Sequence, residues 1–320
     1  MATQGWPRPA IWARRHAAGQ YELRETLSGP TVAHGPVELL LVTLLLLLFA
    51  IGAGFLGSLA GLGGGVIIVP ILVILFHVPF VLAVGASAIS VLATSNTAGS
   101  AYVHDHLTDL RIGMFLEIAT VPGALIGATL TIYLTKAGLV PLLLIPLGVV
   151  LLATIPGSFL RHHSEVPEGV VPDHLSRRLG FGGSYQDKHL RRQVDYMGES
   201  TKPALGVMFS AGIVSGMFGI GSGVLKVLAL DRAMKLPMKV STATSNFMIG
   251  VTAAAGAGVL LAAGYMNPVL AAPVALGTTL GAFVGSRILP GLSNSVVRYV
   301  FLVLMAVLAV ELILRGLGIG

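Results

Sequence analysis

Long apolar runs separated by short polar turns make up most of this chain of 320 residues. Between Leu39 and His104, 66 consecutive residues include no Asp, Glu, Lys or Arg. A helix that crosses a membrane needs about 20 such residues, so this run has room for several of them. The pattern predicts an all-α, polytopic membrane protein.

Ten apolar segments can be delimited, five before and five after a polar stretch. They cover about 37–57, 63–76, 80–103, 112–134, 138–155, 203–219, 221–234, 238–263, 267–288 and 296–315. The predicted divisions are a basic N-terminal tail (1–36), a first transmembrane repeat (37–155), a polar connecting loop (156–202) and a second transmembrane repeat (203–320). The loop is expected to be a solvated linker, because its seven basic and six acidic residues nearly cancel.

The two sets of segments align with each other. When residues 54–127 are shifted by 158 positions onto 212–285, 14 of the 74 positions are identical without a gap. The matches include Gly54, Gly61, Gly63, Gly65, Pro79, Gly123 and Gly127, which fall on Gly212, Gly219, Gly221, Gly223, Pro237, Gly281 and Gly285. Matched apolar residues would mean little in this composition, but glycine and proline have distinct backbone roles. We interpret the chain as two tandem repeats of four to five transmembrane segments.

The amino-acid composition further limits the class of protein. Only 11% of the residues are charged, against about 25% in a typical soluble protein. The absence of cysteine excludes disulfides and thiolate chemistry. The net charge of +6 is interpreted as retention of basic loops in the cytoplasm and attraction to anionic lipid, not as nucleic-acid binding.

Glycine breaks interrupt one segment in each half. The stretch GLGGG at 61–65 precedes a segment that would be about 20 Å long as a helix, too short for a hydrocarbon core of about 30 Å. No Lys-Ser/Thr follows it, so a phosphate-binding P-loop is excluded. The matching stretch GIGSG lies at 219–223. Paired broken helices are typical of transport sites, and their exposed N–H groups suit an anion. Close helix packing alone would explain the later pairs Gly123/Gly127 and Gly281/Gly285.

A succession of motifs resembles a known family. GLGGG at 61–65 is followed by AVGAS at 83–87, TSNTAG at 94–99, DLR at 109–111 and PGALIGA at 122–128, and the second half carries STATSN at 241–246. Their order is similar to that of the TauE/SafE family of membrane transport proteins, the sulfite exporters. The resemblance covers roughly 40–155 and 203–315 and implies movement of small sulfur-containing anions. The turn HDHLTD at 104–109 departs from the family's usual basic residue and glycine.

Lys226 is the most unusual residue within an apolar segment, where the first half has Ile68. An ionisable group at membrane depth costs about 2.5–3.5 kcal/mol on insertion scales and usually faces a cavity. Beside the glycine-freed N–H groups it would complete an oxyanion site; alternatively, it reaches an interface or pairs with Asp231. The candidate substrate-binding residues are Gly61, Gly63, Gly64, Gly65, Ser87, Thr94, Asn96, Gly219, Gly221, Ser222, Gly223, Lys226, Ser245 and Asn246.

Hydroxyl and amide groups belong to this set because neutral donors can replace the water around an anion. Interhelical hydrogen bonding is the alternative for each of them. Glu117 lies near the start of its segment and is interpreted as either interfacial or a proton carrier.

Membrane orientation depends on whether the short broken segments cross. If all five segments of each half cross, the halves are inverted and the N-terminus lies opposite the connecting loop. If the short segments only re-enter, both termini and the loop share the cytoplasmic side. Four arginines in the tail favour the second arrangement.

The sequence predicts a secondary transporter of small anions, such as sulfite or organosulfonates, working by alternating access in the bacterial inner membrane. A passive anion channel and a carrier of a non-sulfur solute are the alternatives. No carboxylate pair, HExxH or GxSxG motif indicates an enzyme. We expect no cofactor and no metal. The expected partners are a small anionic substrate and the lipid bilayer, with homo-oligomerisation left open.

Overall fold

The structure is a computed structural model that describes residues 36–60, 64–104, 107–160, 170–187, 192–288 and 294–318. Its helices are α2 (Pro36–Ala60), α3 (Gly65–Ile74), α4 (Phe80–His104), α5 (Leu110–Lys136), α6 (Pro141–Leu160), α7 (His174–Leu179), α8 (Thr201–Phe218), α9 (Gly223–Leu228), the π-helix η1 (Ala229–Ala233), α10 (Met238–Ala262), α11 (Pro268–Ile288) and α12 (Asn294–Gly316). Each of the ten predicted apolar segments corresponds to one of these helices or, for α9 and η1, to a consecutive pair.

Five of the described helices are long and apolar enough to cross a membrane. They include Leu40–Gly57, Phe80–Thr97, Leu110–Lys136, Met238–Ala262 and Pro268–Gly285, while Gly65–Ile74 and Pro141–Ile155 are shorter apolar helices. The chain is therefore a multi-pass membrane protein, as the sequence predicts.

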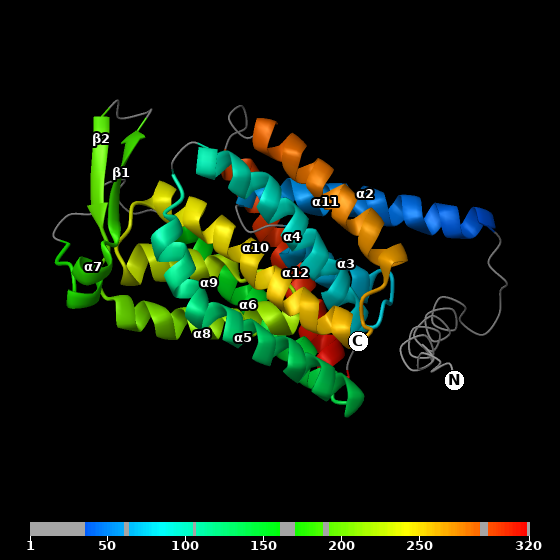
Figure 1. Ribbon diagram of the computed structural model, residues 1–320. Helices are drawn as coiled ribbons and strands as arrows, with labels where there is room; N and C mark the ends of the chain where they lie inside the picture. Colours follow the sequence, from blue (N-terminus) through cyan, green and yellow to red (C-terminus); the bar gives the residue numbers. More distant parts are fainter. Residues whose placement is uncertain are drawn as a thin grey trace, which may run out of the picture.

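The helices form one elongated bundle (Figure 1). α2 packs on α11 along one edge, α5 packs on α8 along the other, and α4 and α10 lie between them. α6 and α12 pack on each other and contact α9 and α3 respectively. The contacts thus run repeatedly between the first and the second half of the chain.

The direction of the helices bears on the two predicted orientations. α2 begins at the end of the bundle away from strands β1 and β2, whereas α8 begins at their end (Figure 1). This matches the arrangement in which the start of the first half lies opposite the connecting loop. It corrects the preference drawn from the tail arginines, which lie outside the described residues.

Glycines permit two close helix crossings at matching places. A Cβ atom added to Gly54 of α2 would lie 2.2 Å from the carbonyl oxygen of Thr278 in α11, and one added to Gly212 of α8 would lie 2.2 Å from that of Thr120 in α5. Only a residue without a Cβ fits at either position. Each member of one crossing lies 158 positions from its counterpart in the other.

Two further pairs at the same spacing share a local conformation. His77 and Lys235, each in the turn after a broken helix, have positive φ angles of 51° and 52°. Asp109 accepts a hydrogen bond from the Ile112 N–H at the start of α5, and Asn267 caps the start of α11 in the same way.

The polar connector contains folded structure. Strand β1 (Gly182–Asp187) pairs antiparallel with β2 (Arg192–Met197), so the described chain is not wholly α. Phe181 is buried against α5 residues, and the Tyr196 hydroxyl donates a hydrogen bond to Asp109. Burial, together with the Asp109 carboxylate, raises the pKa of Tyr196, so it remains a donor. Residues 170–187 and 192–200 therefore differ from the expected solvated linker.

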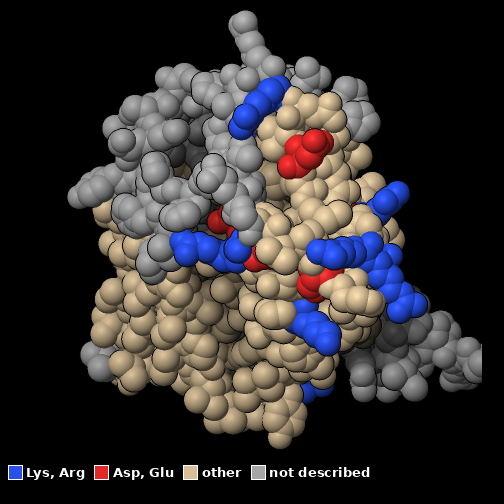
Figure 2. Space-filling view, turned by 90° about the vertical axis from the view of Figure 1, so that its left-hand side faces the viewer, with Lys and Arg blue, Asp and Glu red and all other residues tan. Residues whose placement is uncertain are grey.

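Charged side chains gather on the end of the molecule that carries the hairpin. Figure 2 views this end, where blue and red side chains lie together on the exposed surface. The long helices behind it are apolar. Such a division suits a protein whose charged end stands in water while its bundle lies in lipid.

Candidate functional site

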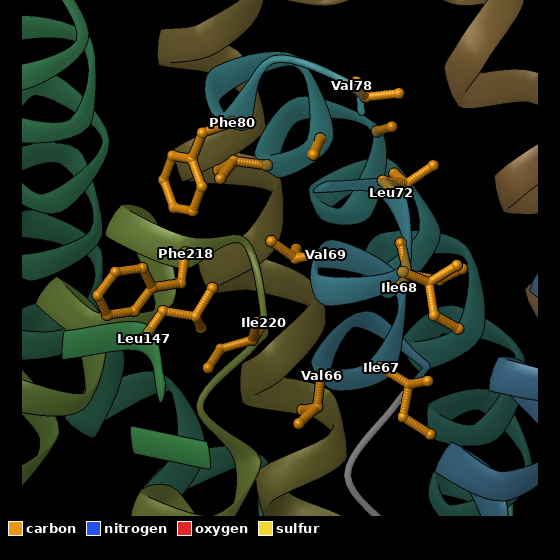
Figure 3. Packing of buried hydrophobic residues seen from close by; sticks show 14 of the residues in the cluster. Val66, Ile67, Ile68, Val69, Leu72, Val78, Phe80, Leu147, Phe218 and Ile220 are labelled. Carbon is orange, nitrogen blue, oxygen red and sulfur yellow. The ribbon is translucent and has the colours of Figure 1, made fainter. Parts of the chain in front are cut away.

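The two glycine breaks meet in the middle of the bundle. α3 is buried along Gly65–Leu72, and Figure 3 shows Val66 and Val69 facing Ile220 of the link between α8 and α9. Phe80 and Phe218 stack edge to face with ring centroids 6.4 Å apart beside this contact. The broken ends of the two short helices are thus packed against each other by apolar side chains.

Ser87 of α4 joins the two breaks through its hydroxyl. Its Oγ atom lies 2.8 Å from the carbonyl oxygen of Gly219 and 3.3 Å from that of Gly65. The equivalent Ser245 of α10 lies 3.5 Å from the Gly223 carbonyl oxygen. Both serines are buried, so their hydroxyls find partners on backbone carbonyl oxygens beside the breaks.

The second break requires left-handed backbone at three positions. Gly219, Gly221 and Ser222 have φ angles of 65°, 73° and 46°. A side chain on Gly219 would also meet the Val84 carbonyl oxygen at 2.5 Å, so glycine is needed there on two grounds. Ser222 is 5% exposed, and its Oγ has no hydrogen-bond partner.

Lys226 is completely buried one turn into α9. Its Nζ donates a hydrogen bond of 2.9 Å to the Met248 carbonyl oxygen and another to the Thr252 hydroxyl. Nζ also lies 3.6 Å from Oε1 of Glu117. Lys226 therefore does not reach an interface, and the carboxylate beside its ammonium is that of Glu117 of α5.

Thr252 bridges the two charged groups. Its Oγ1 lies 3.0 and 3.2 Å from the two carboxylate oxygens of Glu117 and 2.7 Å from the Met248 carbonyl oxygen. Glu117 is 6% exposed, so its carboxylate is held inside the bundle rather than at an interface. The signal in the sequence is that Glu117 and Lys226 are opposite charges on separate apolar segments, but no local pattern shows that these segments meet.

Two cavities flank the second break. One, of about 10 Å³, is lined by Thr252 and by four glycines that include Gly219 and Gly221. This is about the space that one water molecule needs. The other, of about 80 Å³, is mostly apolar and includes Ser222 in its lining. Neither has both the volume and the polar lining that a sulfur oxyanion needs. The bundle is closed around the pair, because Lys226 and Glu117 are both buried.

The other described candidates have contacts of their own. Thr94 donates to carbonyl oxygens of its own helix, Asn246 does the same to Thr242, and Asn96 is exposed. Gly64 packs against Gly54 and Thr278. Gly61 and Gly63 lie outside the described residues.

Comparison with known proteins provides independent evidence on the family of this chain. A family model described as "Sulfite exporter TauE/SafE" matches residues 46–312. The chain is 25% identical over 288 residues to the "Probable membrane transporter protein YunE" of Bacillus subtilis (strain 168), which covers 85% of this chain and 98% of that protein. It is 26% identical over 250 residues to the "Probable membrane transporter protein YdhB" of the same organism, with 78% and 89% covered. No solved structure matches.

Proposed function

Because the chain belongs to the TauE/SafE sulfite exporter family of membrane transporters, we propose that it carries sulfite or an organosulfonate across the bacterial inner membrane by alternating access. The observation that carries the substrate class is the ammonium of Lys226, which is 0% exposed within the helix bundle. A buried cation at membrane depth is costly and usually marks a path for a charged solute. We assign the protein no chemical reaction.

The distance between Lys226 and Glu117 is compatible with replacement of the carboxylate by a substrate anion. The separation of 3.6 Å from the Glu117 carboxylate is longer than the roughly 2.7–2.9 Å of a tight charge-assisted hydrogen bond. An oxyanion could therefore take the place of the carboxylate, with Thr252 as a neutral donor beside it. Neutral hydrogen-bond donors stabilise a bound anion but hold it less tightly than a second cationic side chain would.

The helix packing supports alternating access between two related bodies. α2, α4 and α11 pack together, as do α5, α8 and α10, and the two groups meet where α4 contacts α10. We propose that the chain is an inverted duplication whose repeats exchange helices to build these bodies. The matched glycine crossings and the matched φ angles of His77 and Lys235 support this proposal.

Two other functions fit the same scaffold. A passive anion channel would conduct without saturating, and a carrier for a non-sulfur solute would saturate with a different substrate. The closed bundle around Lys226 favours the carrier, because a conducting pore needs a continuous open path.

Uptake into proteoliposomes tests the proposal. Labelled sulfite, sulfate, thiosulfate and methanesulfonate would be offered with and without an imposed pH gradient. We expect saturable uptake of sulfite or the sulfonate, and accelerated exchange when unlabelled anion is trapped inside. Linear uptake without such counterflow would identify a channel, and no movement of the four anions by folded protein would overturn the sulfur assignment.

A double variant that removes both charges of the Glu117–Lys226 pair can be tested in the same assay. Lys226→Met alone would leave Glu117 buried without a partner, which destabilises a protein by about 3–5 kcal/mol. Lys226→Met combined with Glu117→Gln removes both charges together and keeps their volumes. We expect the double variant to remain folded and to lose anion uptake; wild-type uptake would show that Lys226 does not bind the substrate.

A further inference from the structure

The pair of Glu117 and Lys226 sets a charge constraint on any anion that binds there. The ionised pair is neutral as a whole and lies in a bundle where Lys226 is 0% exposed. An anion that joined the ionised pair would leave one uncompensated negative charge inside the bundle. Such a charge is so costly that buried groups usually change their protonation instead.

We propose that Glu117 couples transport to protons: a monovalent oxyanion binds the Lys226 ammonium while one proton from water binds a Glu117 carboxylate oxygen. This inference rests on the proposed function. The ion pair opens, the new O–H bond forms on Glu117, and the anion takes the freed ammonium. The buried charge is zero before and after, so the stoichiometry is one proton to one anion.

The hydrogen bonds around Thr252 accommodate both states. With Glu117 ionised, the Thr252 hydroxyl donates to the carboxylate, 3.0 Å away. With Glu117 protonated, the carboxyl O–H donates to Thr252, and the Thr252 hydroxyl turns to the Met248 carbonyl oxygen, 2.7 Å away. No buried polar group of this set loses its partner when the proton arrives.

Lys226 is the charged side chain that acts directly on Glu117. The helices packed around α5 in the described parts of the chain include α4, α8 and α10. These helices carry the titratable groups Tyr102, His104, Lys202 and Lys239, whereas the ion pair and hydrogen bonds of Glu117 are made with Lys226 and Thr252. The proton on Glu117 therefore depends mainly on whether Lys226 is occupied by an anion.

The charge balance also predicts selectivity. A sulfonate or hydrogen sulfite carries one negative charge and satisfies the exchange with a single proton. Sulfate carries two and would leave one charge uncompensated. We expect monovalent sulfur oxyanions to be preferred over divalent ones of similar size.

Proton uptake on binding tests the inference with purified full-length protein in nanodiscs. Methanesulfonate is the probe, because a sulfonate does not itself take up a proton near neutral pH. A pH indicator in weakly buffered solution should report about one proton taken up per anion bound. By linkage, Kd should rise about tenfold per pH unit once Glu117 is ionised in the unbound protein.

Two variants provide the comparison. Lys226→Met combined with Glu117→Gln has neither charge, so methanesulfonate should neither bind nor be accompanied by proton uptake. Glu311→Gln removes the carboxylate of a partly exposed ion pair with Arg315 in α12 and should behave as wild type. The wild-type proton count needs no variant, so misfolding of the double variant would leave the test intact.

The outcomes separate the two proposals. Binding of methanesulfonate or sulfite by wild type without proton uptake would overturn the coupling and leave the proposed function standing. Binding of neither anion would overturn both. Proton uptake with methanesulfonate that persists in the double variant would also overturn the assignment of the exchange to this pair.

Discussion

The two broken helices of this transporter occupy matching places but have different chemistry. In α3 the residue one turn beyond the break is Ile68, 1% exposed among apolar side chains. In α9 the equivalent residue is Lys226, paired with Glu117. In the described residues, the charged pair lies at the second break, and apolar side chains take its place at the first.

The comparison also separates what a break does for structure from what it does for function. At both breaks a buried serine contacts the carbonyl oxygen of the first helical residue, Ser87 at Gly65 and Ser245 at Gly223. Only the second places an ammonium there. The glycines account for the geometry of the site, and Lys226 accounts for its charge.

The largest effect is expected when a buried lysine is placed at the first break without a carboxylate partner. Ile68→Lys buries an ammonium where the counterpart of Glu117 is Ala275. We expect a loss of at least about 2.5–3.5 kcal/mol, and little folded protein in size-exclusion profiles. Adding Ala275→Glu should restore part of the folded peak. Wild-type behaviour of the single variant would show that the two sites are not equivalent.

The glycine crossings test whether the halves are structurally equivalent. Gly54→Ala and Gly212→Ala should each lower stability by about 1–3 kcal/mol, because each added Cβ meets a backbone carbonyl oxygen at 2.2 Å. Gly52→Ala and Gly206→Ala are matched controls on α2 and α8, where nothing lies within 4 Å of the added Cβ. Thermal melts in detergent would compare the four; a large difference between Gly54→Ala and Gly212→Ala would argue against the duplication.

The serines should differ by a smaller amount. Ser87→Ala removes a 2.8 Å hydrogen bond to Gly219 and should cost about 1 kcal/mol. Ser245→Ala removes only a 3.5 Å contact and should cost less. Melting temperatures of the two variants measure the difference, and equal losses would contradict the geometry.

The smallest effect is expected at the turns after the breaks, His77 in the first half and Lys235 in the second. Lys235 pairs with Glu199 of the connector at 2.7 Å, and its hydrogen bond is the main cause that lowers the pKa of Glu199. A lowered pKa stabilises the fold above the unfolded value of about 4.3 and loses that contribution as pH falls through the folded value. Glu199→Gln should therefore lower stability by less than about 1 kcal/mol at pH 7, since Lys235 is 45% exposed.

The same variant should show no deficit in strong acid, where Glu199 is protonated in wild type as well. Melting temperatures of the two proteins at neutral pH and near pH 3 measure this convergence. A deficit that persisted in acid would mean that Glu199 acts through packing rather than charge.

The helices and the breaks were predictable because their signals are local. Charge-free runs define the helices, and glycine clusters at 61–65 and 219–223 mark where they stop. The pair of Glu117 and Lys226 was not predicted because it depends on α5 and α9 being brought together across more than a hundred residues of chain. Lys226 itself was predicted, since a lone cation in an apolar run is visible without its partner.

The prediction of a solvated linker for the connector was wrong for a different reason. Its charge balance and glycines indicated a solvated linker, yet Tyr185, Val194 and Tyr196 lie at alternating positions of a hairpin and pack near Val240. Alternation over so few residues is a weak signal, and the burial that stabilises it comes from the ends of the membrane helices. Tertiary contact, not local propensity, explains the hairpin.

The interleaved helices also set an order of assembly during synthesis. α8 follows α5 after a much shorter stretch of chain than separates α11 from α2, so the α5–α8 crossing can close earlier than the α2–α11 crossing. At about 5–20 residues per second, α2 waits roughly 10–40 s for α11. Leu40, Leu44 and Leu48 of α2 stay exposed in the finished bundle, so this side of α2 suits lipid both while the helix waits and after it has packed.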